Sequence, residues 1–289
     1  MHPLFHLNRL ATVYRLKETV AVQVTECATD GEALAQLWIE PHTFKVVRAR
    51  WEAHRGEGLR PPAAPEVSAL EGLTAYFGCA RAVDCALSGY PRLATTLFLD
   101  GVSALIQAET FLLAERGYRS PEAYEEHWKR SYRGSCRYYS NPDAVQRSWS
   151  EYAETRRAGK NLFNRFKTLA LDRTGDGLRL WASMSDSFHE MAFTLHFEPG
   201  GRTIVSATEA IIRAPDDVCH EAARYVEGLK GTSLHGVGRR EIAAILGNGQ
   251  GCVHLIDLAS DAAALLGRAG KLLSAGEQLS NGGEGNHAI

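Results

Sequence analysis

The sequence predicts an α+β protein made of two related halves, each an antiparallel sheet followed by helices. Two observations carry this prediction: short motifs recur in the same order in both halves, and β-type alternation gives way to helical spacing in the second. An aromatic-rich helical segment joins the halves. The predicted boundaries are 1–114 for a degenerate first copy, 115–160 for the connector, 161–273 for the second half and 274–289 for a mobile tail.

The internal repeat rests on blocks that keep their order along the chain. Each block is a weak match by itself, but several in the same order are hard to produce by chance. The matched pairs are Leu37-Trp38-Ile39-Glu40-Pro41 with Leu195-His196-Phe197-Glu198-Pro199, Glu71-Gly72-Leu73 with Glu227-Gly228-Leu229, and the six residues from Gly101 with the six from Gly251.

Strands are predicted over residues 168–182 and 189–213, where β-branched and aromatic residues alternate in part with polar ones. The Pro199-Gly200-Gly201 sequence predicts a turn that divides the second of these stretches. Both stretches are therefore expected to form antiparallel strands.

Helices are predicted over residues 218–229, 239–246 and 253–266, where apolar residues recur at helical spacing. Asp216 or Asp217 can cap the first helix, and Gly231 and Gly247 can end the first two.

The connector begins with Ser120-Pro121-Glu122, a helix-start signal, and Asn141-Pro142-Asp143 offers a second one. Its many aromatic residues predict a helical hairpin packed across both halves, and the alternative is that they form the wall of a ligand pocket. These residues are Tyr124, Trp128, Tyr132, Tyr138, Tyr139, Trp149 and Tyr152.

Charge and composition narrow the classes of partner. The formal net charge is −2 and no long basic run occurs, so nucleic acid is not expected as a partner. No stretch approaches the roughly 20 apolar residues of a membrane helix, and the start of the chain lacks a signal-peptide pattern, so we expect a cytoplasmic protein. The six cysteines form no Cys-x-x-Cys pair and are expected to be reduced.

Cys252 is the first candidate for chemistry, because it follows Gly251 and precedes a predicted helix. The positive end of the helix dipole is expected to lower the pKa of its thiol. The structural alternative is a small buried cysteine that packs beneath a glycine turn.

Four residues of the second half could together hold a metal ion. Cys219, Cys252, His189 and His254 supply two thiols and two imidazoles, a set suited to zinc, although their spacing is not diagnostic. The repeat places Gly31, Val102 and Ala104 opposite His189, Cys252 and His254, so only the second half keeps these reactive types. Neither a dinucleotide-binding fingerprint nor a Walker loop is present, and no organic cofactor is expected.

Charged residues near the start of the second half are predicted to be exposed charges or turn formers. They are Arg165, Lys167, Asp172, Arg173 and Asp176, of which Asp172 and Asp176 are the candidate turn formers.

Residues 162–267 carry a series of motifs in a fixed order. These are Met184-Ser185-Asp186, His189-Glu190-Met191, Ile204, Pro215, Cys219, Leu229-x-Gly231, Gly236 and Gly251-Cys252-Val253-His254-Leu255. In order and spacing this series resembles the bacterial family called domain of unknown function 2889, which is marked by His-Asp-Met and Gly-Cys-Thr-His-Leu. This chain has Glu190 in place of the family's Asp and Val253 in place of its Thr.

The resemblance implies little about activity, because the family is uncharacterised, but it implies a setting in bacteria that catabolise aromatic compounds. Carried over residue by residue, the motifs mark His189, Glu190, Cys219, Cys252 and His254.

The residues are compatible with an enzyme, a lyase or hydrolase that acts on a small aromatic compound. His189 or His254 would be the general base, and Glu190 or an arginine would position the substrate. The alternatives are a metal- or sulfur-handling protein that uses Cys252 and Cys219, and a non-catalytic assembly subunit. A homodimer is a further possibility.

Overall fold

We analysed a computed structural model of the chain, which describes residues 1–56, 59, 65–154, 157 and 159–281. Its centre is an eight-stranded antiparallel sheet in the order β4-β3-β2-β1-β5-β6-β7-β8. The α+β class is confirmed. The strands are β1 (His2–Arg15), β2 (Val20–Ala28), β3 (Gly31–Ile39), β4 (Val46–Gly56), β5 (Asn161–Thr174), β6 (Gly177–Asp186), β7 (Glu190–Phe197) and β8 (Ile204–Arg213).

The sheet consists of two four-stranded meanders, one from each half of the chain. They join through β1 and β5, which pair antiparallel with Arg9 opposite Lys167. The antiparallel sheet predicted for each half is therefore part of one continuous sheet. The Pro199-Gly200-Gly201 turn lies between β7 and β8 as predicted, and the amide of Gly201 donates to the carbonyl of Glu198 at 2.8 Å.

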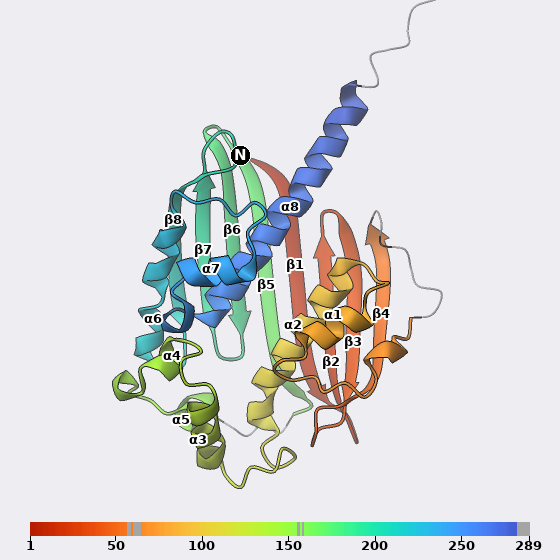
Figure 1. Cartoon of the computed structure of the whole chain (residues 1–289), viewed down its shortest axis with the longest axis vertical. Coiled ribbons are helices and arrows are strands. Elements are labelled where there is room, and N and C mark those ends of the chain that lie inside the picture. Colours follow the sequence, from red (N-terminus) through yellow and green to blue (C-terminus); the bar gives the residue numbers. More distant parts are fainter. Residues whose placement is uncertain (57–58, 60–64, 155–156, 158, 282–289) are drawn as a thin grey trace, which may run out of the picture.

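Helices follow each meander and pack on one face of the sheet, where α2 and α8 cross β1 and β5 (Figure 1). The described helices are α1 (Ala80–Ala86), α2 (Arg92–Ala108), α3 (Pro121–Ser131), α4 (Arg137–Ser140), α5 (Trp149–Ala153), α6 (Asp217–His220), α7 (Arg239–Ile245) and α8 (Val253–Asn281). None of these helices is long and apolar enough to span a lipid bilayer.

The helix signals of the sequence are found at several of the expected places. Ser120 caps α3 by accepting from the amide of Ala123, and Asp216 caps α6 by accepting from the amide of Val218. The helix predicted over 218–229 is instead α6 followed by a 3₁₀ segment, Ala223–Leu229. Helix α8 continues past Leu273 to Asn281, so the expected tail begins as helix, and residues 282–289 lie outside the described part.

Strand alternation puts one face of the sheet in the core, beneath the helices, and none of the described helices covers the other face (Figure 1). Along β1, Phe5, Leu7 and Val13 are buried. Their neighbours on the other face include Leu10, which lies opposite Phe166 of β5, and both are exposed.

Two buried cations, Arg9 and Lys167, share two partly buried carboxylates, Asp100 and Asp261, where the two meanders meet. Arg9 Nη1 lies 2.6 Å from Asp100 and 2.9 Å from Asp261, and Lys167 Nζ lies 2.8 Å from each of the same two carboxylates. Burial by itself would lower the pKa of Lys167, but the charges of Asp100 and Asp261 outweigh it and raise that pKa. Arg9 also pairs with the buried Glu26 at 2.7 Å, and Glu26 in turn pairs with Arg268 of α8 at 2.6 Å, so the charges of this region form one wider network.

The prediction that Arg165 and Lys167 are exposed is wrong, because their exposed fractions are 3% and 4%. Asp172, predicted to form a turn, instead lies within β5 and pairs with Arg179 of β6. Arg165 and Lys167 lie on the inward face of β5, and each is paired with a carboxylate there. These partners come from other elements, so the local sequence could not reveal them.

The recurring blocks occupy matching places in the strands but not in the helices. The first pair of blocks ends β3 and β7 respectively. In contrast, Gly101 lies within α2, whereas Gly251 precedes α8. Asp100 of α2 and Asp261 of α8 are the positions that face the same two cations.

Replacement of Lys167 by methionine tests the buried cluster. Lys167→Met leaves the partly buried carboxylates of Asp100 and Asp261 with Arg9 as their remaining cation in the cluster, and we expect the free energy of unfolding to fall by about 3–5 kcal/mol. Urea denaturation measures this loss. Arg48→Met, which removes an exposed ion pair with Glu66, is the control and should change stability little. Equal effects of the two variants would contradict a structural role for the cluster.

Candidate functional site

A cavity of about 540 Å³ lies between the connector and the helix-covered face of the sheet. Of the seven connector aromatics, all but Tyr152 line it, so the alternative of a pocket wall describes them better than a packed hairpin does. Tyr152 instead donates its hydroxyl to the carbonyl of Phe188, in the turn between β6 and β7.

Both halves of the chain contribute to this cavity. From the first half, α2 supplies Val102, Ser103 and Ile106. From the second, the β6–β7 turn supplies His189 and the start of α8 supplies His254.

Asp186 organises the turn that carries His189. Its Oδ1 accepts from the backbone amides of Phe188 and His189 at 2.8 and 2.7 Å, and lies 3.1 Å from His189 Nδ1. Its Oδ2 accepts from Arg165 Nε and Nη2 at 3.0 and 2.9 Å. Arg165 also donates to Ser103 of α2 at 3.0 Å, so the turn is tied to the first half of the chain.

The charge of Asp186 fixes the tautomer of His189. Burial by itself would raise the pKa of Asp186, but His189 and Arg165 outweigh it and hold that pKa well below its usual range. An ionised carboxylate only accepts hydrogen bonds, so Nδ1 of His189 must carry the proton. In the neutral ring, Nε2 is then the atom with a free lone pair.

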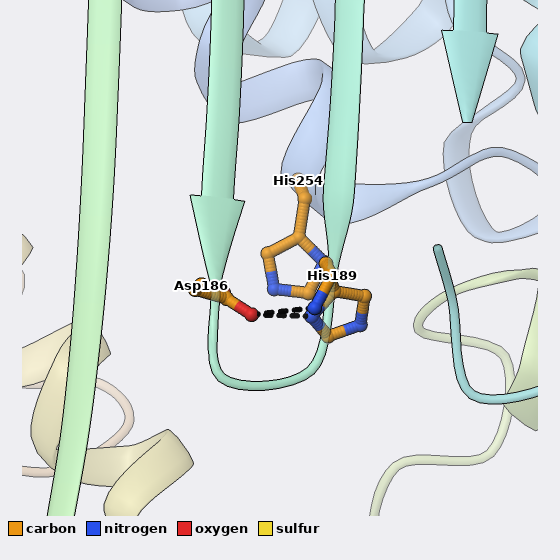
Figure 2. A group of neighbouring side chains, drawn as sticks. All are labelled: Asp186, His189 and His254. Atoms are coloured by element: carbon orange, nitrogen blue, oxygen red, sulfur yellow. Dashed lines mark hydrogen bonds and ion pairs between the residues drawn. The ribbon is translucent and has the colours of Figure 1, made fainter. Parts of the chain in front are cut away.

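His254 lies against His189 (Figure 2). The ring centroids are 4.0 Å apart with an interplanar angle of 39°. Burial, followed by the charges of His189 and Arg165, lowers the pKa of His254 well below its usual value. His254 is therefore neutral near pH 7. Protonation of both His189 and His254 would place two positive charges side by side and is disfavoured.

The expectation that helix placement lowers the pKa of Cys252 is wrong. Burial raises the pKa to about 12, which outweighs the opposing effect of the Leu255 and His254 amides. Burial likewise raises the pKa of Cys219 to about 12. Cys252 Sγ lies 4.0 Å from His254 Nδ1, and both cysteines line the cavity as neutral thiols.

Of the four residues expected to share a metal ion, only His189 and His254 belong to one compact group of potential ligands. Among the described residues, the compact group of potential ligands is Asp186, His189 and His254, whose donor atoms lie within 4.8 Å of one another. Asp186 already accepts five hydrogen bonds, so its geometry suits an orienting role better than direct coordination. The cavity-lining Cys219 and Cys252 do not belong to that group.

Glu190 occupies a different surface. It begins β7, opposite Ser185 and Arg213, and strand alternation points it away from the buried side of Met191. Glu190 is absent from the described lining of the cavity.

Sequence reasoning did not assign Asp186 and Arg165 to the site. For Asp186 a signal existed, since an acidic residue three positions before His189 can cap a turn and reach the ring. For Arg165 the sequence held no comparable signal, because its partners lie on β6 and α2.

The lowered pKa of His254 predicts how stability depends on pH. An unfolded histidine titrates near pH ~6.5. Below that pH the unfolded chain binds a proton that folded His254 does not, so stability is lost as pH falls, by up to about 1.4 kcal/mol per pH unit. Urea unfolding from about pH 7 to about pH 5 should show a steeper loss in the wild type than in His254→Gln. Parallel profiles would contradict the neutral state of His254.

Comparison with known proteins gives one result. The family described as DUF2889, a protein of unknown function, matches residues 173–266. The match includes Asp186, His189, Cys219, Cys252 and His254, and excludes the connector. No curated protein and no solved structure matches the chain significantly. Over residues 173–266, the chain resembles the DUF2889 family of proteins of unknown function.

Proposed function

We propose that this protein is an enzyme, a lyase or hydrolase, that acts on a small aromatic compound by acid–base chemistry without an organic cofactor. The observation that carries the proposal is the pairing of His189, oriented by Asp186, with neutral His254 on the wall of an aromatic-lined cavity.

In the proposed mechanism each residue has a defined task. His189 Nε2 takes a proton from the substrate or from an attacking water, and the ionised carboxylate of Asp186 stabilises the imidazolium that forms. The same proton then passes to the leaving atom as its bond to the substrate breaks, which restores neutral His189. His254 can offer a hydrogen bond without adding positive charge.

The cavity suits a small, flat ligand. Its volume of about 540 Å³ lies in the range of roughly 300–1,000 Å³ that is common for small-molecule sites. Trp128 contacts Tyr132 at 4.1 Å between ring centroids and stacks with Tyr139 at 6.0 Å, and all three rings line the cavity. Such faces favour aromatic ligands through burial and ring stacking.

The alternatives, metal or sulfur handling and a non-catalytic assembly role, predict other behaviour. Elemental analysis of the purified protein, together with thiol titration, tests the metal- or sulfur-handling alternative. A metal held by Cys252 should be lost in Cys252→Ser. A purely structural role predicts that His189→Asn changes stability alone.

Catalysis through the histidine pair predicts a specific pattern of variants. His189→Asn and Asp186→Asn should each lower kcat by roughly 10²–10⁴-fold, because one removes the base and the other its orientation. Turnover would be measured on a panel of small aromatic esters, ethers and hydroxy acids.

The matched control is His196→Asn, on the opposite face of β7, which should leave kcat unchanged. Glu190→Gln tests the role predicted for Glu190 from the sequence. Full activity of both His189→Asn and Asp186→Asn on a substrate of the wild type would refute the acid–base proposal.

A homodimer stays a prediction, and the uncovered sheet face is where a second copy would pack. Phe166 is 56% exposed, and exposed Leu10 and Trp181 lie on the same face. If two copies pair there, Phe166→Lys should convert a dimer into a monomer in light-scattering measurements. A wild type that is monomeric at all concentrations would contradict the dimer.

A further inference from the structure

The described lining of the cavity includes an arginine whose charge is not matched within the cavity. Apart from the histidines, the charged side chains of that lining are Arg137, Arg239 and Asp257. Arg239 pairs with Asp257, since its Nε and Nη2 lie 3.0 and 2.6 Å from Oδ1 of that carboxylate. Arg137 instead pairs with Glu221, which lies outside the described lining. The cavity wall therefore has an excess of one positive charge, at Arg137.

The guanidinium of Arg137 is largely buried and only partly satisfied. Its side chain is 12% exposed, whereas that of Glu221 is 51% exposed. Among the described residues, Nη1 donates to Gln250 at 3.3 Å, Nη2 donates to Glu221, and Nε is buried without an acceptor. An ion pair with a half-exposed carboxylate is weak, and a guanidinium offers five N–H donors. Arg137 therefore has both charge and donors left for a further acceptor.

Main-chain contacts fix Arg137 beside the candidate site. Its amide donates to the carbonyl of Gly251 at 2.9 Å, and Gly251 lies three residues before His254. Helix α8 begins at Val253, so the positive end of its dipole lies in the same region. The potential around Arg137 thus favours an anion close to the segment that carries His254.

The aromatic wall begins directly after this arginine. Tyr138 and Tyr139 follow it in α4 with ring centroids 5.1 Å apart, and Tyr139 stacks with Trp128 at 6.0 Å. All three rings line the cavity. A compound whose carboxylate is joined to its ring directly or by a short link can therefore contact both the wall and the guanidinium.

We propose that the cavity binds aromatic carboxylates and that Arg137 holds the carboxylate. A planar guanidinium matches a carboxylate through two parallel hydrogen bonds, and the rings of the wall contact the aromatic part. The incoming carboxylate competes with Glu221 for the guanidinium. The inference rests on the proposed function, since it names the class of compound that enters the same cavity, and it assigns Arg137 to binding and not to proton transfer.

Calorimetric titration of the full-length protein with phenylacetate and with phenylacetamide tests the proposal. The two compounds share a ring and a link and differ in the charge of the headgroup. The wild type should bind phenylacetate roughly 10–100-fold more tightly, because hydrogen bonds to a charged group are the stronger ones. Arg137→Met should abolish this preference. Equal binding of the two compounds by the wild type, or binding of neither, would overturn the proposal.

Glu221→Gln should produce the opposite change. It removes the competing carboxylate, so the affinity for phenylacetate should rise by about 2–5-fold while that for phenylacetamide stays the same. The matched control is Arg133→Met, because Arg133 is an exposed connector arginine outside the described lining, and it should keep the wild-type preference. A preference that survives in Arg137→Met would refute the assignment. Where that variant does not fold, an unchanged phenylacetate affinity in Glu221→Gln would refute it.

His189→Asn separates this inference from the proposed function. It should lose turnover but keep the preference for phenylacetate, and loss of the preference would place the carboxylate on the histidines and not on Arg137. A wild type that binds phenylacetate selectively but turns over no aromatic compound would refute the acid–base proposal alone. Turnover of neutral aromatic esters without any selectivity for the carboxylate would refute the present inference alone.

Discussion

The buried cluster of Arg9, Lys167, Asp100 and Asp261 is the interaction on which the arrangement of the two halves depends. Each cation pairs with a carboxylate from each half, so the cluster joins β1, β5, α2 and α8 at one point. Such a cluster adds little net stability compared with an apolar core, but removal of one member leaves an uncompensated buried charge. It therefore specifies one relative placement of the helices and disfavours the others.

The placement of α2 and α8 also determines where residues of the candidate site lie. Asp261 follows His254 by two helical turns, so both lie on the side of α8 that faces the sheet. Asp100 precedes Ser103 by one turn of α2, and Arg165 lies two residues before Lys167 on the same face of β5. The charged cluster and the chain Ser103–Arg165–Asp186–His189 thus share α2 and β5, and the orientation of His189 depends on the packing of both halves.

Features with a local physical cause were predictable from the sequence. The Pro199-Gly200-Gly201 turn, the Ser120 cap and the start of α8 depend on residues within a few positions of each other. The burial of Arg165 and Lys167 was not predictable, because it follows from the pairing of β1 with β5, which are far apart in the chain. His189 and His254 were predicted from their motifs to act in one site, and the structure brings their ring centroids to 4.0 Å from one another. The protonation state of Cys252 was not predictable from the sequence. Helix position and burial act on the pKa of its thiol in opposite directions, and only the structure shows that burial is stronger.

Only part of the cavity lining lies inside the segment that matches the DUF2889 family. Asp186, His189 and His254 lie inside residues 173–266, whereas the aromatic wall and Cys136 belong to the connector. The groups able to move protons thus come from the segment shared with DUF2889, and the surface that would select a ligand comes from outside it. A relative with a different connector could keep the histidine pair and accept another compound.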